Sequence, residues 1–203
     1  MNKYKISLIE GDGIGPELTK ATLAVLDSAQ ANFDLKFDIV EAEAGDATFQ
    51  KRGVALPDDT IEKIKASHAC LKGPVGETAA DVIVKLRLMF DLYANLRPIK
   101  SYPKSGAARP DIDMYFVREN TEDLYKGLEF SLGDTTVALR VITRKNTERI
   151  ARKGFEIARR KSPPSTKRTS CALPTVCLQA FAEKFRNNTL TSPSTSCTWT
   201  LPR

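Results

Sequence analysis

The fold is decided by a strand, a glycine-rich turn and a helix that follow one another in the stretch KISLIEGDGIGPELTKATLAVL (residues 5–26). Lys5 to Ile9 is a short apolar run typical of a buried strand. Pro16 suits the first position of a helix, where its missing N–H breaks no hydrogen bond. Apolar and small residues then recur at helical spacing, which predicts one face of a helix. They are Leu18, Ala21, Thr22, Val25, Leu26 and Ala29.

Strands and helices continue to alternate as far as residue 160, which predicts an α/β protein with a largely parallel sheet. We expect further strands at residues 35–40, 68–71, 93–96, 112–117 and 136–142. We expect further helices from Pro57, over 79–90 and over 147–160, and a loop or crossover at 101–109. His68, the sole histidine, is expected on a buried strand with a structural role.

The charge of the chain is uneven along its length. The net charge is +6, yet the last 43 residues contain six basic residues and only Glu183 as an acid. The first 160 residues therefore hold 25 basic and 24 acidic side chains. Because the body is nearly neutral, we expect no nucleic-acid partner.

Residues 161–203 differ from the body in composition. They contain 14 of the 30 Ser and Thr residues and three of the four Cys. Periodicity disappears from Ser162 onward, which predicts loop or disorder. Without metal-ligand spacing or a secretion signal, the cysteines indicate neither zinc nor disulfides.

No apolar run approaches the roughly 18 to 20 residues that span a bilayer, and the first residues lack a signal-peptide pattern. We expect a cytoplasmic protein without a membrane partner. Three segments are expected: 1–99 as the first part of a cofactor-side domain, 100–160 as the start of a substrate and dimerisation domain, and 161–203 as an aberrant Ser/Thr/Pro-rich tail.

The glycine-rich turn, Glu10 to Glu17, has the spacing Gly-x-Gly-x-Gly. It departs from the Gly-x-Gly-x-x-Gly fingerprint of dinucleotide-binding turns. The glycines alone therefore favour a plain tight turn over a ligand loop. The aspartates at 12, 111 and 113 lack the spacing of a metal site.

Four arginines and a tyrosine are the candidate substrate residues. Each arginine by itself is typical of a solvated surface. We expect Arg97 and Arg118 to end strands, however, where α/β folds collect ligands. Guanidinium forks suit a substrate with several carboxylates, and a phenol can serve as a general acid. The set comprises Arg87, Arg97, Arg109, Arg118 and Tyr125.

Four strings in this order carry a family resemblance: residues 10–17, LKGPVGE at 71–77, DLYANLRP at 91–98 and VRENTE at 117–122. Over roughly residues 4–160 the chain resembles the isocitrate/3-isopropylmalate dehydrogenase family of β-decarboxylating dehydrogenases. That resemblance implies an isopropylmalate dehydrogenase-like fold, of which only the N-terminal half would be present.

The resemblance also implies a reaction. The family oxidises a 2-hydroxy acid with NAD or NADP and then releases the β-carboxylate as carbon dioxide. It uses Mg²⁺ or Mn²⁺, which polarises the new keto group. Residues 76–87 look most like 3-isopropylmalate dehydrogenases, of leucine biosynthesis, whereas residues 49–71 also resemble homoisocitrate dehydrogenases. Isocitrate, homoisocitrate and 3-isopropylmalate therefore all stay open, with the last ranked first.

Roles for individual residues follow from the same resemblance. Arg87, Arg97 and Arg118 match arginines that clamp the carboxylates, Arg109 matches less closely, and Tyr125 matches the tyrosine that protonates the enol carbon. For the cofactor, the implied contacts are Ile14, Glu77 and Asp81. Family members are homodimers.

Family members run to roughly 330 residues or more, so we expect the adenine-binding loop, the metal aspartates and a catalytic lysine to be missing. A catalytically inactive, frameshifted fragment is therefore an alternative reading. Shifted by one nucleotide, permitted codons for residues 162–167 encode valine, threonine, alanine, valine, histidine and lysine, as in the family's lysine segment. The nucleotide sequence of codons 155–170 tests this hypothesis, and the competing one is a natural short protein with a basic tail.

Overall fold

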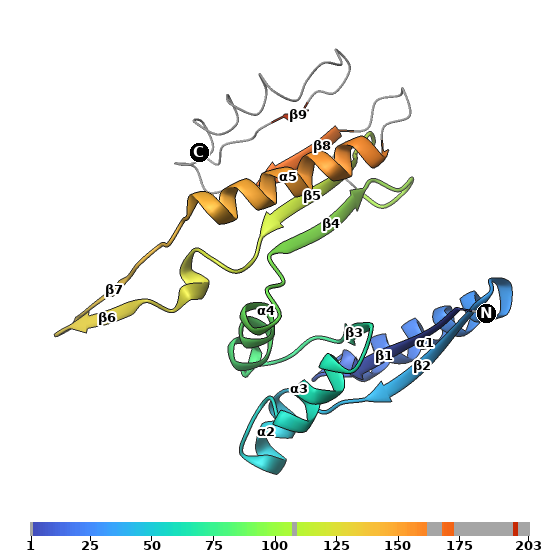
Figure 1. Cartoon of the computed structure of the whole chain (residues 1–203), viewed down its shortest axis with the longest axis horizontal. Coiled ribbons are helices and arrows are strands. Elements are labelled where there is room, and N and C mark those ends of the chain that lie inside the picture. The colour runs from blue at the N-terminus through green and yellow to red at the C-terminus, as the bar shows by residue number, and fades with distance from the viewer. Residues whose placement is uncertain (1, 107–108, 162–167, 173–196, 199–203) are drawn as a thin grey trace. The chain divides into compact units, whose positions relative to one another are not determined.

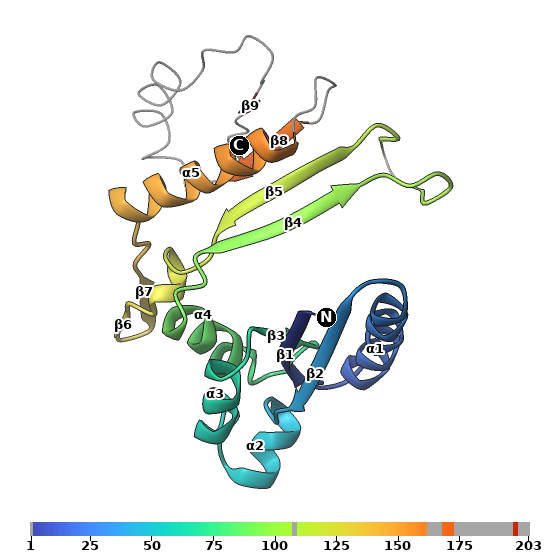
Figure 2. The same cartoon turned by 45° about the vertical axis from the view of Figure 1, so that its right-hand side comes forward.

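The computed structural model of the chain describes residues 2–106, 109–161, 168–172 and 197–198. They belong to two compact units, unit 1 (Met1–Leu86) and unit 2 (Arg87–Arg203). Figure 1 shows the elements of both units, coloured from blue at the N-terminus to red at the C-terminus, and Figure 2 shows them from a second direction. The domain boundary expected between residues 99 and 100 stays a prediction.

Unit 1 is built on a parallel three-stranded sheet in the order β2-β1-β3. Its strands are β1 (Asn2–Ile9), β2 (Leu35–Glu41) and β3 (Ala69–Lys72). Helix α1 (Gly15–Asn32) connects β1 to β2 and lies beside them in both views (Figures 1 and 2). The β-turn-α unit and the parallel sheet predicted from the sequence are both present.

Three further helical segments belong to unit 1, and a fourth crosses from Leu86 of unit 1 to Arg87 of unit 2. Helices α2 (Asp46–Arg52) and α3 (Asp58–Lys65) lie between β2 and β3 in the chain. After β3 the chain forms one π-helical segment, η1 (Ala80–Val84), which continues as α4 (Lys85–Met89). The helix expected over 79–90 therefore changes hydrogen-bond pattern within it, and α2 is an element that the sequence did not predict.

Unit 2 has a mixed sheet in the order β4-β5-β8-β9. Strand β4 (Ala94–Lys100) is antiparallel to β5 (Asp113–Glu119), and β8 (Arg168–Ala172) is parallel to β5. Strand β9 (Cys197–Thr198) pairs with β8. These last two strands differ from the expected loop or disorder, and the other residues from 162 onward lie outside the described residues.

The remainder of unit 2 is a short helical turn, a hairpin and one long helix. The turn is the 3₁₀ segment η2 (Leu124–Lys126), and the hairpin consists of β6 (Glu129–Leu132) and β7 (Thr135–Ala138). Helix α5 (Arg144–Lys161) packs on β5. Its Ile150 and Ala151 form a small buried core with Val117 of β5.

One expectation about burial is wrong. His68 is exposed, just before β3, where its Nδ1 accepts a hydrogen bond from the Lys5 N–H at 3.0 Å. On α1, Leu18 and Val25 of the predicted helix face are 49% and 67% exposed. Helical spacing identifies an apolar face, but only a packing partner buries it.

The glycine-rich turn is packed against the loop that follows β3. The Asp12 N–H donates to the Pro74 carbonyl at 2.8 Å. Gly11 has a φ of +77°, and a Cβ built on it would overlap the Pro74 carbonyl oxygen. Gly13 has a similar φ of +60° but no neighbouring atom within 4 Å of such a Cβ. The turn therefore joins two loops of unit 1 through backbone contact.

This pair of glycines predicts a difference in stability. Gly13→Ala is expected to cost about 1–2 kcal/mol, the strain of a left-handed L-residue. Gly11→Ala meets the same strain and a backbone clash, so it is expected to cost roughly 1–3 kcal/mol more. Urea unfolding of both variants, followed by circular dichroism, measures the difference. Equal unfolding midpoints would contradict the close packing of the two loops.

Candidate functional site

Two guanidinium groups flank one phenol in unit 2. Arg118 Nη2 donates a hydrogen bond to Tyr125 Oη at 2.9 Å. The guanidinium carbons of Arg87 and Arg118 lie 5.4 and 5.7 Å from the centre of the tyrosine ring, within cation–π range. All three side chains are half-buried. We call Arg87, Arg118 and Tyr125 the arginine–tyrosine cluster.

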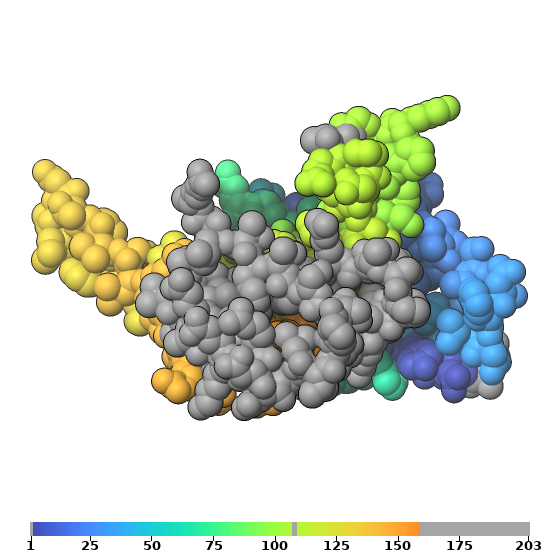
Figure 3. All heavy atoms as spheres, turned by 90° about the horizontal axis from the view of Figure 1, so that it is seen from above, coloured from blue at the N-terminus to red at the C-terminus, as the bar shows by residue number. Residues whose placement is uncertain are grey.

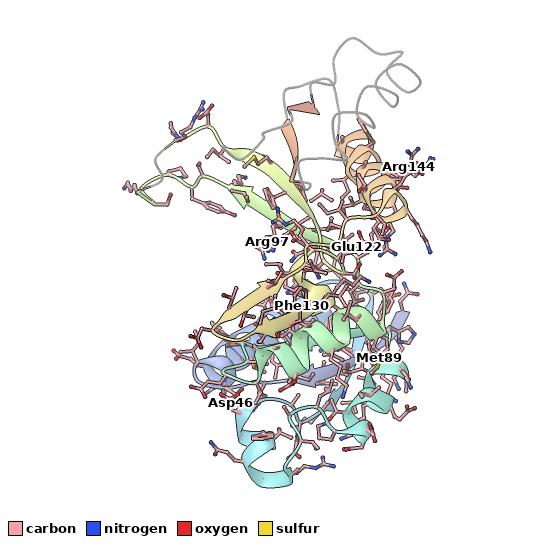
Figure 4. The ribbon with its side chains drawn as sticks, turned by 90° about the vertical axis from the view of Figure 1, so that its left-hand side faces the viewer. Asp46, Met89, Arg97, Glu122, Phe130 and Arg144 are labelled. Atoms are coloured by element: carbon pink, nitrogen blue, oxygen red, sulfur yellow. The ribbon has the colours of Figure 1, made fainter. Side chains whose placement is uncertain are left out.

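The pairing of β4 with β5 brings a third arginine to the same face of the sheet. Asn95 lies opposite Arg118 and Arg97 opposite Phe116, so Asn95, Arg97 and Arg118 share one face. Arg97 Nε donates to Asn95 Oδ1 at 3.3 Å. Arg97 lies in the middle of β4, and its label in Figure 4 is beside that strand. The expectation that it ends a strand is wrong.

The helical turn that carries the tyrosine is held by Asp123. This residue has a φ of +69°, which is rare for a side chain other than glycine. Its carboxylate accepts hydrogen bonds from the Leu124 N–H at 3.0 Å and from Arg140 Nε at 2.6 Å. Its own N–H donates to the Val141 carbonyl at 2.9 Å. The strained backbone is thus stabilised from two sides, which fixes where η2 begins.

Arg149 of α5 ties together the ends of β4 and β5. Its Nη1 donates to Asp91 Oδ2 at 2.6 Å, and its Nη2 donates to Thr121 Oγ1 at 3.0 Å. Its guanidinium carbon lies 4.3 Å from the centre of the Tyr93 ring. The hydrogen bond from Arg149 lowers the pKa of the Asp91 carboxyl below its usual value. Asp91 and Tyr93 precede β4, and Thr121 follows β5.

Two buried glutamates order the loop after β5. The Glu119 carboxylate accepts hydrogen bonds from the N–H groups of Thr121 and Glu122 at 2.9 and 2.8 Å. The Glu122 carboxylate accepts from the Thr143 N–H at 2.8 Å, next to the start of α5. Glu122 is labelled in Figure 4. Buried charges are stable only when they are bonded in this way, so these hydrogen bonds stabilise the loop between Arg118 and Tyr125.

Arg109 is the predicted substrate residue that does not join the others. It is exposed and forms an ion pair with Asp111, at 3.3 Å between Nη2 and Oδ2. Residues 107 and 108, which directly precede Arg109, lie outside the described part of the chain.

The predicted cofactor residues belong to unit 1. Ile14 precedes α1 and is 63% exposed, Glu77 is exposed in the loop after β3, and Asp81 is exposed in η1. The N–H groups of Asp12 and Gly15 in the turn donate to the carbonyls of Pro74 and Asp12. The turn is therefore not arranged as an open cradle for phosphate.

Two aspartates hold the loop that contains Glu77. The Asp12 carboxylate accepts from the N–H groups of Asp46, Ala47 and Gly76, at 2.9, 3.1 and 3.1 Å. The Asp46 carboxylate accepts from the Glu77 and Thr78 N–H groups, at 2.9 and 2.8 Å, and from Thr78 Oγ1 at 2.7 Å. Asp46 is labelled in Figure 4. Hydrogen bonds from Thr78, first of all its N–H, lower the pKa of the Asp46 carboxyl.

Sequence reasoning missed the residues that orient the site. Asp46 and Arg149 are polar residues outside the quoted motifs, and their partners are distant in the chain. Asn95 lies within the string 91–98 but was not singled out. Asp12 was considered only as a metal ligand and dismissed, and its actual role is to accept three backbone hydrogen bonds.

No three or more His, Cys, Asp or Glu within the described residues are grouped so as to hold a metal ion. These residues alone therefore do not fit the expected metal. No helix in this described part is long and apolar enough to cross a membrane.

A family model described as isocitrate/isopropylmalate dehydrogenase matches residues 5–188, beyond residue 160 where we expected the resemblance to end. A 3-isopropylmalate/3-methylmalate dehydrogenase of Methanocaldococcus jannaschii is 50% identical over 171 residues, 83% of this chain and 50% of that protein. An isocitrate/homoisocitrate dehydrogenase of Thermus thermophilus is 45% identical over 161 residues, 76% of this chain and 47% of that protein.

The fold is also similar to that of solved structures. A crystal structure of isocitrate dehydrogenase from Methylococcus capsulatus superposes with a TM-score of 0.78 and 32% identity, covering 97% of this chain and 60% of that one. The chain spans about half the length of the curated relatives it matches.

The network of unit 1 predicts an acid-sensitive stability. The pKa of Asp46 is lower in the folded chain than in the unfolded chain. Its contribution to folding stability is therefore complete above the ordinary aspartate pKa and is lost as the pH falls through the folded-state pKa. Asp46→Ala is expected to lower the urea unfolding midpoint at about pH 6. The further decrease of that midpoint between about pH 6 and about pH 3 is expected to be smaller in Asp46→Ala than in the wild-type chain. Glu41→Gln, an exposed acid on β2, serves as the control. An unchanged pH profile in Asp46→Ala would contradict this role.

Proposed function

The chain belongs to the isocitrate/isopropylmalate dehydrogenase family, and on that basis we propose that it serves the NAD-dependent oxidative decarboxylation of a 2-hydroxy acid, with 3-isopropylmalate as the substrate. The observation that carries this proposal is the contact of the Tyr125 phenol with two guanidinium groups, those of Arg87 and Arg118. The similarity to 3-isopropylmalate dehydrogenases favours that substrate.

The arginines supply charge and geometry for a substrate with two carboxylates. Arg118 and Arg97 share one face of the sheet. Arg87 belongs to α4, outside that sheet, and its guanidinium carbon lies 5.4 Å from the centre of the Tyr125 ring. A guanidinium fork donates two parallel hydrogen bonds to a carboxylate, which orients it as well as attracting it. We therefore assign Arg87, Arg97 and Arg118 to substrate binding, with Arg109 as a further candidate.

The direction of one hydrogen bond decides what the phenol can do. Because Arg118 donates to Tyr125 Oη, the phenolic hydrogen stays available for another acceptor. After the hydroxyl carbon has been oxidised and carbon dioxide has left, the substrate carries an enolate that needs a proton at carbon. Tyr125 supplies this proton, and the two guanidinium groups stabilise the phenolate that remains.

When bound, NAD would supply the acceptor for the hydride of the hydroxyl carbon. Ile14, Glu77 and Asp81 of unit 1 would contact the cofactor, with NADP as the alternative. The N–H groups of Glu77 and Thr78 are already bonded to Asp46, so this loop is ordered before anything binds.

Incubating the purified chain with 3-isopropylmalate, NAD and Mg²⁺ while recording NADH absorbance tests the activity. Parallel reactions with isocitrate and homoisocitrate test the substrate, because relatives named for those acids are 45% and 40% identical. The competing proposal is a catalytically inactive fragment that retains substrate binding, favoured by the half-length match. NADH formation supports the first proposal, and calorimetric binding of 3-isopropylmalate without NADH supports the second.

Variants separate the two roles within the cluster. Tyr125→Phe is expected to lower turnover by about 10²–10⁴-fold while the dissociation constant for 3-isopropylmalate stays nearly unchanged. Arg97→Gln is expected to weaken binding by at least about tenfold, since it removes a charged hydrogen-bond donor. Lys36→Gln on β2 is the control for loss of one positive charge. Equal binding by Arg97→Gln and the control would refute the assignment of Arg97.

The hairpin of unit 2 supports a homodimer. Phe130 and Leu132 of β6 are 48% and 65% exposed, and a two-stranded hairpin is only marginally stable alone. The space-filling view shows this segment, in yellow, as a projection from α5 (Figure 3), and Phe130 is labelled in Figure 4. We propose that a second copy of the chain covers these apolar side chains.

Sedimentation velocity measures this association. The double variant Phe130→Asp/Leu132→Asp is expected to sediment as a monomer, because two buried charges would oppose the contact. Ser131→Asp, on the opposite face of the same strand, is the control and is expected to leave the dimer intact. A wild-type chain that sediments as a monomer, or a double variant that remains dimeric, would contradict the proposal.

A further inference from the structure

The turn that carries Tyr125 begins with a strained backbone. Asp123 has a φ of +69° and a ψ of −139°. Glycine adopts this combination readily, whereas a residue with a Cβ is strained in it. Such strain persists only where the surrounding contacts enforce it, and it is concentrated at functional sites. An aspartate at this position, where glycine would be unstrained, indicates that its carboxylate has a role.

Hydrophobic burial does not hold this turn in place. None of the three residues of η2, Leu124 to Lys126, is buried, and Leu124 is 57% exposed. Within the turn, the Gly127 N–H donates to the Leu124 carbonyl at 3.0 Å. One such bond closes the turn but does not orient it. The direction of the Tyr125 side chain therefore depends on polar contacts at the ends of η2.

Asp123 makes these contacts with its backbone and with its side chain. One carboxylate oxygen, Oδ1, accepts hydrogen bonds from the Leu124 N–H and from Arg140 Nε. The Asp123 N–H donates to the carbonyl of Val141, with which Asp123 forms an isolated β-bridge. Arg140 and Val141 follow β7 in the chain. The turn is therefore tied to a second segment, which leads out of the β6–β7 hairpin.

We propose that Asp123 is a positioning residue for Tyr125. This inference rests on the proposed function, in which the Tyr125 phenol gives a proton to the substrate. Proton transfer requires a donor held within hydrogen-bond reach of its target, and a small displacement lowers the rate strongly. Asp123 fixes where η2 begins, and the phenol of that turn then meets Arg118 Nη2 at 2.9 Å. Asp123 acts through Tyr125 and needs no contact with the substrate.

The substitution Asp123→Gly separates positioning from stability. Glycine relieves the strain, which offsets the lost carboxylate bonds and the greater freedom of the unfolded chain. The urea unfolding midpoint is therefore expected to stay close to that of the wild-type chain. The Tyr125 ring is nevertheless expected to leave its place. Its signal in NMR spectra of the full chain with ¹³C-labelled tyrosine, identified by its absence in Tyr125→Phe, is expected to shift.

Further variants show that the shift has this cause. Asp134→Gly makes the same change at an exposed residue between β6 and β7 and is the matched control, expected to leave the Tyr125 signal in place. Arg140→Gln removes the second partner of the carboxylate and is expected to shift the signal as Asp123→Gly does. Asp123→Asn tolerates a positive φ and keeps an acceptor for the Leu124 N–H, so it is expected to restore most of the wild-type signal.

Turnover of 3-isopropylmalate gives a second measurement. In Asp123→Gly, kcat is expected to fall by about tenfold or more while KM stays nearly unchanged, because the arginines that bind the substrate are intact. The NMR signal does not require turnover, so the two proposals can fail separately. Absence of NADH in the wild-type chain counts against the proposed function, and a selective shift of the signal still supports the positioning role.

Three results would overturn the positioning role. The first is an unshifted Tyr125 signal in Asp123→Gly or Arg140→Gln, and the second is an equal shift in Asp134→Gly. The third is a lowered unfolding midpoint in Asp123→Gly with an unshifted signal, which would show that Asp123 only stabilises the fold.

Discussion

The antiparallel pairing of β4 with β5 is the constraint on which the candidate site depends. Its register puts Asn95 opposite Arg118 and brings Arg97 to the same face. A shift by one residue would turn every side chain of one strand to the other face. Arg149 prevents such a shift by bonding to Asp91 ahead of β4 and to Thr121 after β5.

Unit 1 keeps its loops in place by another means. Two carboxylates, those of Asp12 and Asp46, accept hydrogen bonds from five backbone N–H groups and one hydroxyl. Backbone donors in loops have no helix or sheet partner, so a short acid that collects several of them replaces regular structure. The loop that contains Glu77 is ordered in this way although it has few hydrophobic residues.

Charge in unit 2 is used in three distinct ways. Buried acids such as Glu119 order the backbone, and Arg149 joins three elements through paired bonds. The arginine–tyrosine cluster places cations around a titratable phenol, which suits proton transfer to an anionic substrate.

Much of the fold follows from local sequence. Periodicity predicted β1, α1 and β2 as a parallel unit, because a strand and a helix each have their own spacing of apolar residues. The same reasoning missed α2 and placed Arg97 at a strand end, since neither its spacing nor its neighbours show where β4 stops. It also expected His68 to be buried, although burial depends on what packs against a strand.

The sequence by itself determined the order β1-α1-β2, the glycine-rich turn and a set of arginines suited to an acidic ligand. Only the tertiary structure decided which of these side chains meet. Arg118 and Tyr125 are seven residues apart, but Arg87 reaches the same ring from an earlier helix. Asp12 and Gly76 are 64 residues apart, and Asp91 and Arg149 are 58 apart. No local pattern encodes such contacts, because they form only when strand pairing and helix packing bring distant segments together.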